Sequence, residues 1–157
     1  LMLQKHQRVH VIMADANHDP ASGAWPREMF AVLYADDPRI TVDTSADTYY
    51  ACQLCNVSIF AHHGCNAKMS SLSSIFAGKF RELFGSTTYS YAHVGHLHHH
   101  ALKEDTMMIT EQHSPLAAPD ACAAKHGYLS KRSASTIIYH KNFGEVGRTT
   151  RKPDMLK

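Results

Sequence analysis

The stretch Tyr91-Ala-His-Val-Gly-His-Leu-His-His-His100 ends an apolar, β-prone run in a cluster of imidazoles. His96 and His98 are two residues apart, and on an extended segment such side chains point the same way. Gly95 before them allows a close approach of the backbone. Neutral imidazole is a common ligand of divalent transition metals. An exposed histidine tract that binds metal incidentally would have the same composition, so the rest of the chain has to decide between the two.

Two earlier segments have the same design. The apolar run Val9–Met13 is followed by Asn17-His18-Asp19, and Val57–Phe60 is followed by His62-His63-Gly64. Taken singly, these fit an ordinary turn and a strand-end histidine pair. In layered α/β proteins, however, ligand sites form beyond the carboxyl ends of strands. If the three strands are neighbours in one sheet, their loops converge on one site.

Composition narrows the class of protein. The 157 residues fit one domain, and a hydrophobic fraction of 44% supports a real core. A net charge of +2 is too small to indicate a nucleic acid or an anionic membrane surface as partner. The chain contains no apolar run long enough to span a membrane. The unusual count is that of histidine, 13 residues.

The N-terminal residues and the cysteines indicate a compartment. Leu1–Gln7 has the pattern of a helix end and lacks the apolar core and cleavage site of a signal peptide. Four cysteines without such a signal do not form a disulfide framework. We therefore expect reduced thiols and a cytoplasmic protein.

The expected helices and strands alternate irregularly along the chain. Helices are predicted over Pro26–Tyr34, with Pro26 at the first position, over Ser71–Phe84, and over Pro119–His126. Strands are predicted over residues 8–13, 39–43, 48–52, 56–60, 87–94, 107–110 and 134–140. This order indicates an α/β (α+β) fold with a mixed sheet or two packed sheets. One domain over 1–142 and an extended polar tail over 143–157 are expected.

The ordered set Asn-His-Asp, His-Gly and Gly-His-x-His, spanning about Val9 to His98, resembles the later half of the calcineurin-like metallophosphoesterases. That resemblance implies two packed mixed β-sheets flanked by helices. It also implies hydrolysis of phosphomonoesters or phosphodiesters with two divalent metal ions.

The resemblance assigns a role to each matching residue. Asn17, His63 and His96 would bind the second metal, with His62 in place of His63 if the register is off by one. His98 would bind the first metal. His18 would contact the substrate phosphate and protonate the leaving oxygen. Mn²⁺ is the favoured ion, and Asn and His ligands also admit Fe²⁺, Co²⁺, Ni²⁺ and Zn²⁺. Five further histidines are not expected to be ligands: His10, His93, His99, His100 and His113.

The sequence also departs from the family pattern. Ala16 stands where the family has glycine, and Cys65 where many members have histidine. The Asp-x-His and Gly-Asp-x-x-Asp motifs, which supply the first metal's ligands and the bridging carboxylate, do not occur before Asn17. Asp15 is a poor substitute, because it is too close to Asn17. We therefore expect the C-terminal portion of such an enzyme, or a degenerate copy, with weak metal binding and little activity.

The substrate and one rival function stay open at this point. DNA and nucleotides are among the phosphoesters that the family hydrolyses, and a prokaryotic or phage DNA-processing role is the one we favour. The rival is a non-catalytic zinc module built from Cys52, Cys55, His63 and Cys65. Against it, the apolar run Val57–Phe60 separates the two halves of this ligand set.

Overall fold

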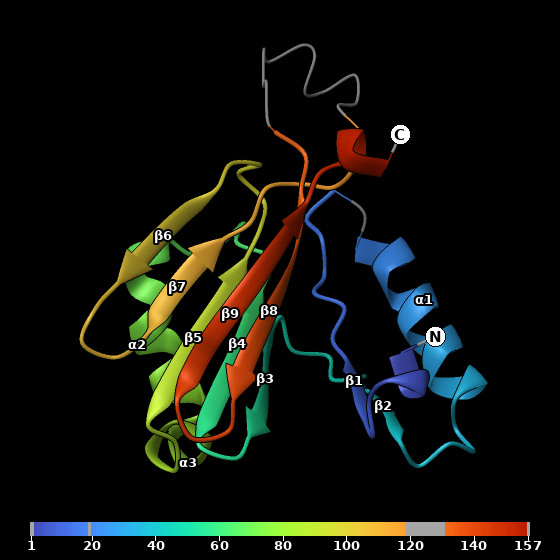
Figure 1. Cartoon of the computed structure of the whole chain (residues 1–157), viewed down its shortest axis with the longest axis horizontal. Helices are drawn as coiled ribbons and strands as arrows, with labels where there is room; N and C mark the ends of the chain where they lie inside the picture. The colour runs from blue at the N-terminus through green and yellow to red at the C-terminus, as the bar shows by residue number, and fades with distance from the viewer. Residues whose placement is uncertain (1, 19, 119–130, 157) are drawn as a thin grey trace.

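The fold is built around a five-stranded mixed sheet (Figure 1). The structure is a computed structural model that describes residues 2–18, 20–118 and 131–156. The strand order is β3-β4-β5-β7-β6. β4, β5 and β7 run parallel, and β3 and β6 pair antiparallel at the two edges. The strands are β3 (Tyr49–Leu54), β4 (Val57–His62), β5 (Tyr89–Val94), β6 (Ala101–Glu104) and β7 (Ile109–Gln112).

The two faces of this sheet are covered differently. The helices α2 (Met69–Lys79) and α3 (Arg81–Gly85) lie on one face, and the antiparallel pair β8 (Ala134–His140) and β9 (Gly144–Arg151) lies on the other (Figure 1). Both faces of β4 are therefore covered, which explains its nearly continuous apolar sequence. The buried core between α2 and the sheet consists of Phe60, Leu72, Phe76, Ala92, Val94 and Met108.

A smaller unit stands beside the sheet (Figure 1). It contains the parallel strands β1 (Val9–Val11) and β2 (Ile40–Val42) with the helix α1 (Pro20–Leu33) between them. Buried Arg27 of α1 joins it to the sheet, because its Nη1 donates to Asp15 Oδ1 and to Tyr50 Oη, each at 3.0 Å. Short 3₁₀ helices, Met2–Gln4 and Pro153–Leu156, lie near the two ends of the chain.

The predicted fold class is confirmed: the protein is α+β, with a mixed sheet, flanking helices and a second, two-stranded sheet packed on it. The structure corrects the prediction of an extended tail over 143–157. Residues Gly144–Arg151 form β9 and pair with β8 along their length. Most of this strand is exposed to solvent, so its sequence lacks the apolar alternation by which strands are predicted.

Two helices differ from their predicted extents. The helix predicted over Ser71–Phe84 is divided at Phe80, whose φ of −115° and ψ of 49° are not helical. α1 begins at Pro20 and contains Pro26 inside it, although a proline inside a helix removes a backbone donor. Strand β6 was not predicted, because Ala-Leu-Lys-Glu consists of good helix formers. The helix predicted over Pro119–His126 lies outside the described residues.

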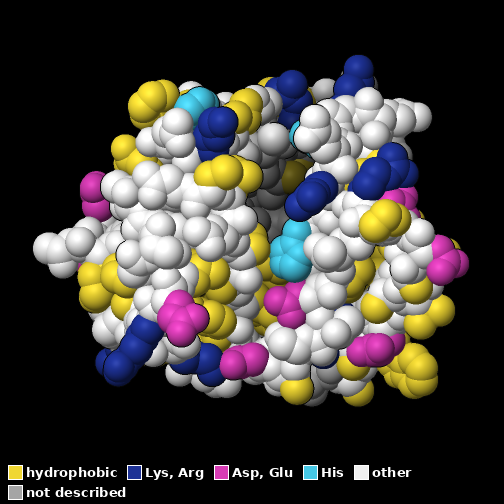
Figure 2. Space-filling view, turned by 90° about the horizontal axis from the view of Figure 1, so that it is seen from below, with side chains coloured by type: hydrophobic (Ala, Val, Ile, Leu, Met, Phe, Trp, Pro, Cys, Tyr) yellow, Lys and Arg dark blue, Asp and Glu magenta, His cyan; other side chains and the backbone are white. Residues whose placement is uncertain are grey.

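The molecular surface carries charges of both signs. Figure 2 shows basic, acidic and hydrophobic side chains interspersed over one face, with a hollow near its centre. Among the described residues, none of the helices is long and apolar enough to cross a membrane.

Candidate metal centre

The candidate centre lies where the parallel strands β4 and β5 end. His62 pairs with Val94 in the sheet register, so His63 and Gly95 leave the same edge together. The Gly95 N–H donates to the His63 carbonyl at 3.0 Å. Gly64 has a φ of +105°, and a Cβ there would lie 3.0 Å from the Gly95 carbonyl oxygen and 3.4 Å from His96 Cβ. The motif glycine is thus required both by its conformation and by the close approach of the two loops.

The three residues predicted to bind the second metal come together. Asn17, from the connection between β1 and α1, places its Oδ1 2.9 Å from His63 Nε2. The ring centroids of His63 and His96 are 5.1 Å apart. The sequence had led us to expect three neighbouring strands in one sheet. The loops converge without that arrangement, because β1 pairs with β2 in a separate sheet. The contact between Arg27 and Tyr50 instead holds the small unit against β3.

The electrostatics of this cluster favour a neutral imidazole at its centre. Burial lowers the pKa of His63, and the neighbouring rings of His96, His62, His18 and His98 lower it further. A neutral imidazole keeps the lone pair that a metal needs.

His96 and His98 have positive φ values of 70° and 57°. Left-handed backbone is uncommon for residues other than glycine. Strained backbone of this kind persists where the surrounding structure holds it in place, often at functional sites.

The His62 side chain is buried and packs against its neighbours. Its ring is 3% exposed and stacks on Tyr49 with centroids 4.4 Å apart. Its Nδ1 accepts a hydrogen bond from the Gly64 N–H at 2.9 Å. His62 thus supports the turn that presents His63.

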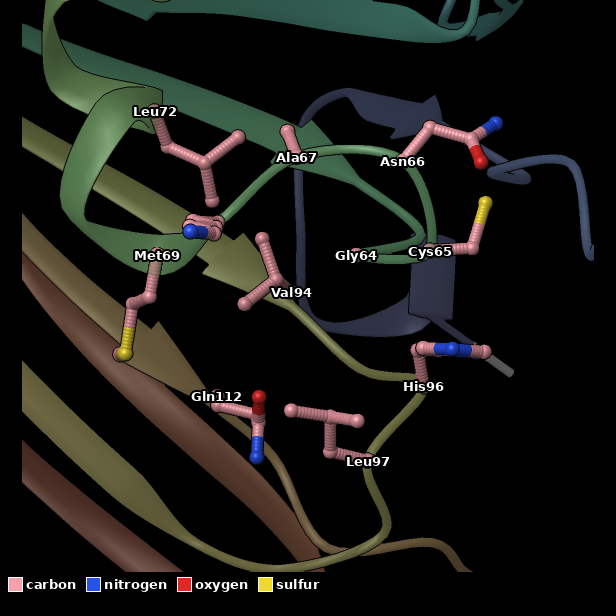
Figure 3. Close-up of a pocket in the computed structure, with 11 residues that line it drawn as sticks. Gly64, Cys65, Asn66, Ala67, Met69, Leu72, Val94, His96, Leu97 and Gln112 are labelled. Carbon is pink, nitrogen blue, oxygen red and sulfur yellow. The ribbon is translucent and has the colours of Figure 1, made fainter.

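A hollow of about 370 Å³ opens beside His96. In Figure 3 the loop from Gly64 to Ala67 passes the loop that carries His96 and Leu97. The side chains of Val94, Leu72 and Met69 form the apolar side of the hollow. Lys68 and Gln112 also line it. The cluster therefore has an adjoining space with both polar and apolar walls.

The zinc-module alternative does not agree with the fold. Cys55 lies in the turn before β4, and His63 follows the other end of that six-residue strand. At about 3.3 Å per residue the two are roughly 20 Å apart along the strand, so they cannot bind one ion. Cys52, Cys55 and Cys65 are free thiols, and burial raises the pKa of Cys52.

The structure also contains a second cluster, formed by His93, Glu111 and His113, which was not predicted from the sequence. Their potential ligand atoms all lie within 4.8 Å of one another. His93 and Glu111 are partners in adjacent strands, and His113 lies two residues beyond Glu111 on the same face. The spacing Glu-x-His at the end of an apolar strand was the available signal, but β7 had been predicted to end earlier, at Thr110.

Comparisons with known proteins add one structural likeness. No family model matches the chain, and no curated protein matches it. The chain is similar to the crystal structure of a conserved uncharacterized protein, a predicted phosphoesterase, from Streptococcus pneumoniae TIGR4. The two are 12% identical with a TM-score of 0.44, over 92% of this chain and 89% of that one. What the fold and the site define is an α+β protein with a histidine-rich candidate metal centre at the carboxyl edge of its mixed sheet.

Proposed function

We propose that the protein is a metal-dependent phosphoester hydrolase of the calcineurin-like type. The observation that carries this proposal is the contact of Asn17 Oδ1 with His63 Nε2 at 2.9 Å, with His96 beside them. Three motifs, which the family resemblance links to one metal, lie far apart in sequence and meet in space. Chance surface histidines would have no reason to meet in this combination.

The donor set fits a divalent transition metal. Asn17 offers an amide oxygen, and His63 and His96 offer imidazole nitrogens, a set that admits Mn²⁺, our favoured ion, as well as Fe²⁺, Co²⁺, Ni²⁺ and Zn²⁺. These three residues are assigned to the second metal of the pair, and His98 is assigned to the first. Bound divalent ions would polarise the phosphoryl oxygens and lower the pKa of a water molecule.

The side chains of this chain divide the remaining work. His18 contacts the phosphate and, when protonated, supplies a proton to the leaving oxygen. The hollow beside His96 receives the rest of the substrate, for which a phosphodiester such as DNA or a nucleotide is the class we favour. Asn17, His63 and His96 are all neutral ligands, so metal binding is weak and hydrolysis is slow.

Manganese binding and cleavage of bis(4-nitrophenyl) phosphate test the proposal. We expect weak Mn²⁺ binding, followed by electron paramagnetic resonance, and slow Mn²⁺-dependent hydrolysis, both lost in His96→Ala. His18→Gln should keep the metal but lower the rate by roughly 10²–10⁴-fold. His10→Gln, an exposed histidine of β1, is the matched control. Manganese binding that survives His63→Ala together with His96→Ala would show that this centre is not the metal site.

A further inference from the structure

The second histidine cluster lies on the sheet face that β8 and β9 cover. His93 Nδ1 is 2.8 Å from His113 Nε2, and His93 Nε2 is 2.8 Å from the Tyr139 hydroxyl of β8. On the other side, Glu111 Oε1 is 2.8 Å from His100 Nε2 and 3.8 Å from His113 Nδ1. Two imidazoles and one carboxylate thus share a half-buried site, whose ligands come from β5, from β7 and from the segment directly after β7.

We propose that His93, His113 and Glu111 form a separate binding site for a zinc-type divalent ion, with the fourth position left to water. Nitrogen ligands with a carboxylate in a four-coordinate array are what Zn²⁺ takes in proteins. In the metal-free state the His93 and His113 nitrogens face each other at 2.8 Å, held by one shared proton. The ion takes the place of that proton, which moves to the other nitrogen of the ring that carried it, so both rings stay neutral.

The protonation states suit a metal. Burial lowers the pKa of His93 to about 4, and burial also lowers that of His113. Burial alone would raise the pKa of Glu111, but hydrogen bonds from Arg148 and His100 outweigh it and lower that pKa to about 2. At neutral pH the site therefore offers two neutral imidazoles and an ionised carboxylate, as metal binding requires.

Arg148 of β9 pairs with the Glu111 carboxylate in the metal-free site and competes with the ion for it. Its Nη1 is 2.7 Å from Glu111 Oε1 and its Nη2 is 2.9 Å from Oε2. Its Nε and Nη2 also donate to Glu145. An ion at Oε1 displaces only the Nη1 contact, because the other contacts of Arg148 keep the guanidinium next to Oε2. Arg148 and Tyr139 then orient two of the ligands from outside, as partners of metal ligands commonly do.

Access to the site is provided by a cavity of about 340 Å³ lined by His93, His100, His113 and Tyr139, among others. Because the ligands belong to the main sheet and their orienting partners to β8 and β9, the bound ion fastens this pair of strands to the sheet. A ligand that binds only the folded state raises the unfolding temperature. The site therefore acts as a stabilising clamp.

Zinc binding by the full 157-residue chain carrying His63→Gln and His96→Gln tests this inference apart from the proposed hydrolase centre. We expect this double variant to retain a single zinc ion after dialysis, and to melt at a higher temperature with zinc. Adding His93→Gln and His113→Gln should remove both effects. Tyr139→Phe should weaken binding roughly 10- to 100-fold, whereas His140→Gln, on the same strand, should leave it unchanged.

Two results would overturn the inference. One is a folded double variant that binds no zinc, and the other is zinc binding that survives the loss of His93 and His113. If the variant lacking both fails to fold, the single variant His113→Gln decides, because that side chain is 30% exposed. It should weaken zinc binding by about tenfold or more, and an unchanged affinity would contradict the site. Failure of the manganese hydrolysis experiment would not affect these results.

Discussion

Backbone conformation at single residues shapes the candidate centre. Gly64, His96 and His98 all have positive φ, and the first two face each other across a gap that admits no extra atom. For a residue with a side chain the left-handed region costs about 1–2 kcal/mol. The histidines tolerate that cost because the hydrogen bond from Gly95 to the His63 carbonyl fixes the loops. Adding a single methyl group in these loops should therefore change the stability of the protein.

Gly64→Ala should lower the free energy of unfolding by about 1–3 kcal/mol, because alanine is strained at this φ and its Cβ meets Gly95. It should also weaken Mn²⁺ binding, since His96 has to move. Gly78→Ala is the control: nothing lies within 4 Å of its Cβ position in α2, and helix propensity predicts a gain of about 0.5–1 kcal/mol. Urea unfolding measures both, and equal effects of the two substitutions would contradict this account.

His93 should make the stability of the metal-free protein depend on pH. Its pKa falls from 6.5 to about 4 on folding because of burial and the nearby His113. The unfolded state therefore binds the proton first as the pH drops. The stability contributed by the neutral ring is complete above pH 6.5 and is lost down to pH 4, at roughly 1 kcal/mol per pH unit.

Denaturant unfolding with a chelator present, from pH 7.5 to 5, measures this slope. His93→Gln should make it shallower, whereas His10→Gln should not change it. Glu111, whose pKa is lowered to about 2, and the Arg148 guanidinium stay ionised in both variants over this range, so their contributions cancel in the comparison. Parallel curves for the wild type and His93→Gln would refute the assignment.

At the scale of elements, β9 is an example of a strand that local sequence does not predict. Most residues of β9 are exposed and polar, and the strand contains two glycines. The attachment of β8 and β9 depends on contacts that no local pattern reveals. Tyr91 and Tyr139 have ring centroids 4.7 Å apart, and the Tyr91 hydroxyl accepts a hydrogen bond from the Glu145 N–H at 2.9 Å.

Gly144→Ala should loosen this pair of strands. Gly144 has a φ of +70°, and a Cβ there would collide with the Tyr91 hydroxyl and the Tyr89 ring. We expect a loss of about 1–3 kcal/mol and faster amide exchange in β8 and β9. Gly147→Ala, whose Cβ would be 3.9 Å from Ile138 Cδ1, should change little. Unaltered exchange in Gly144→Ala would show that this contact does not position the strands.

At the scale of the whole molecule, Arg27 joins the unit of β1, β2 and α1 to the main sheet. Its side chain is 9% exposed and contacts Asp15 and the almost fully buried Tyr50. Asn17 follows Asp15 closely, so this contact also sets how far Asn17 stands from His63. The candidate centre is therefore divided between two parts of the molecule.

Arg27→Ala should cost on the order of 3 kcal/mol, because it leaves a partly buried carboxylate and a buried hydroxyl without their partner. It should weaken Mn²⁺ binding as well, since Asn17 loses its support. Arg39→Ala breaks the exposed ion pair with Asp37 and should change the free energy of unfolding little, because solvent screens this pair. Unchanged manganese affinity in a folded Arg27→Ala variant would contradict the proposed support of Asn17.

The sequence by itself determined the features that depend on local chemistry. The apolar runs Val57–Phe60 and Tyr89–Val94 are strands because both of their faces are buried, and Ala134–His140 was predicted with its observed bounds. Asn17, His63 and His96 could be selected from the sequence as candidate ligands, because metal sites need particular residue types at fixed spacing.

Only the tertiary structure decided which of these pieces meet. β1 is outside the main sheet, yet Arg27 brings Asn17 to His63. The cluster of His93, Glu111 and His113 exists because β5 and β7 are adjacent, although β6 lies between them in sequence. Strand adjacency is a long-range outcome of packing, and the spacing of residues along the chain does not contain it.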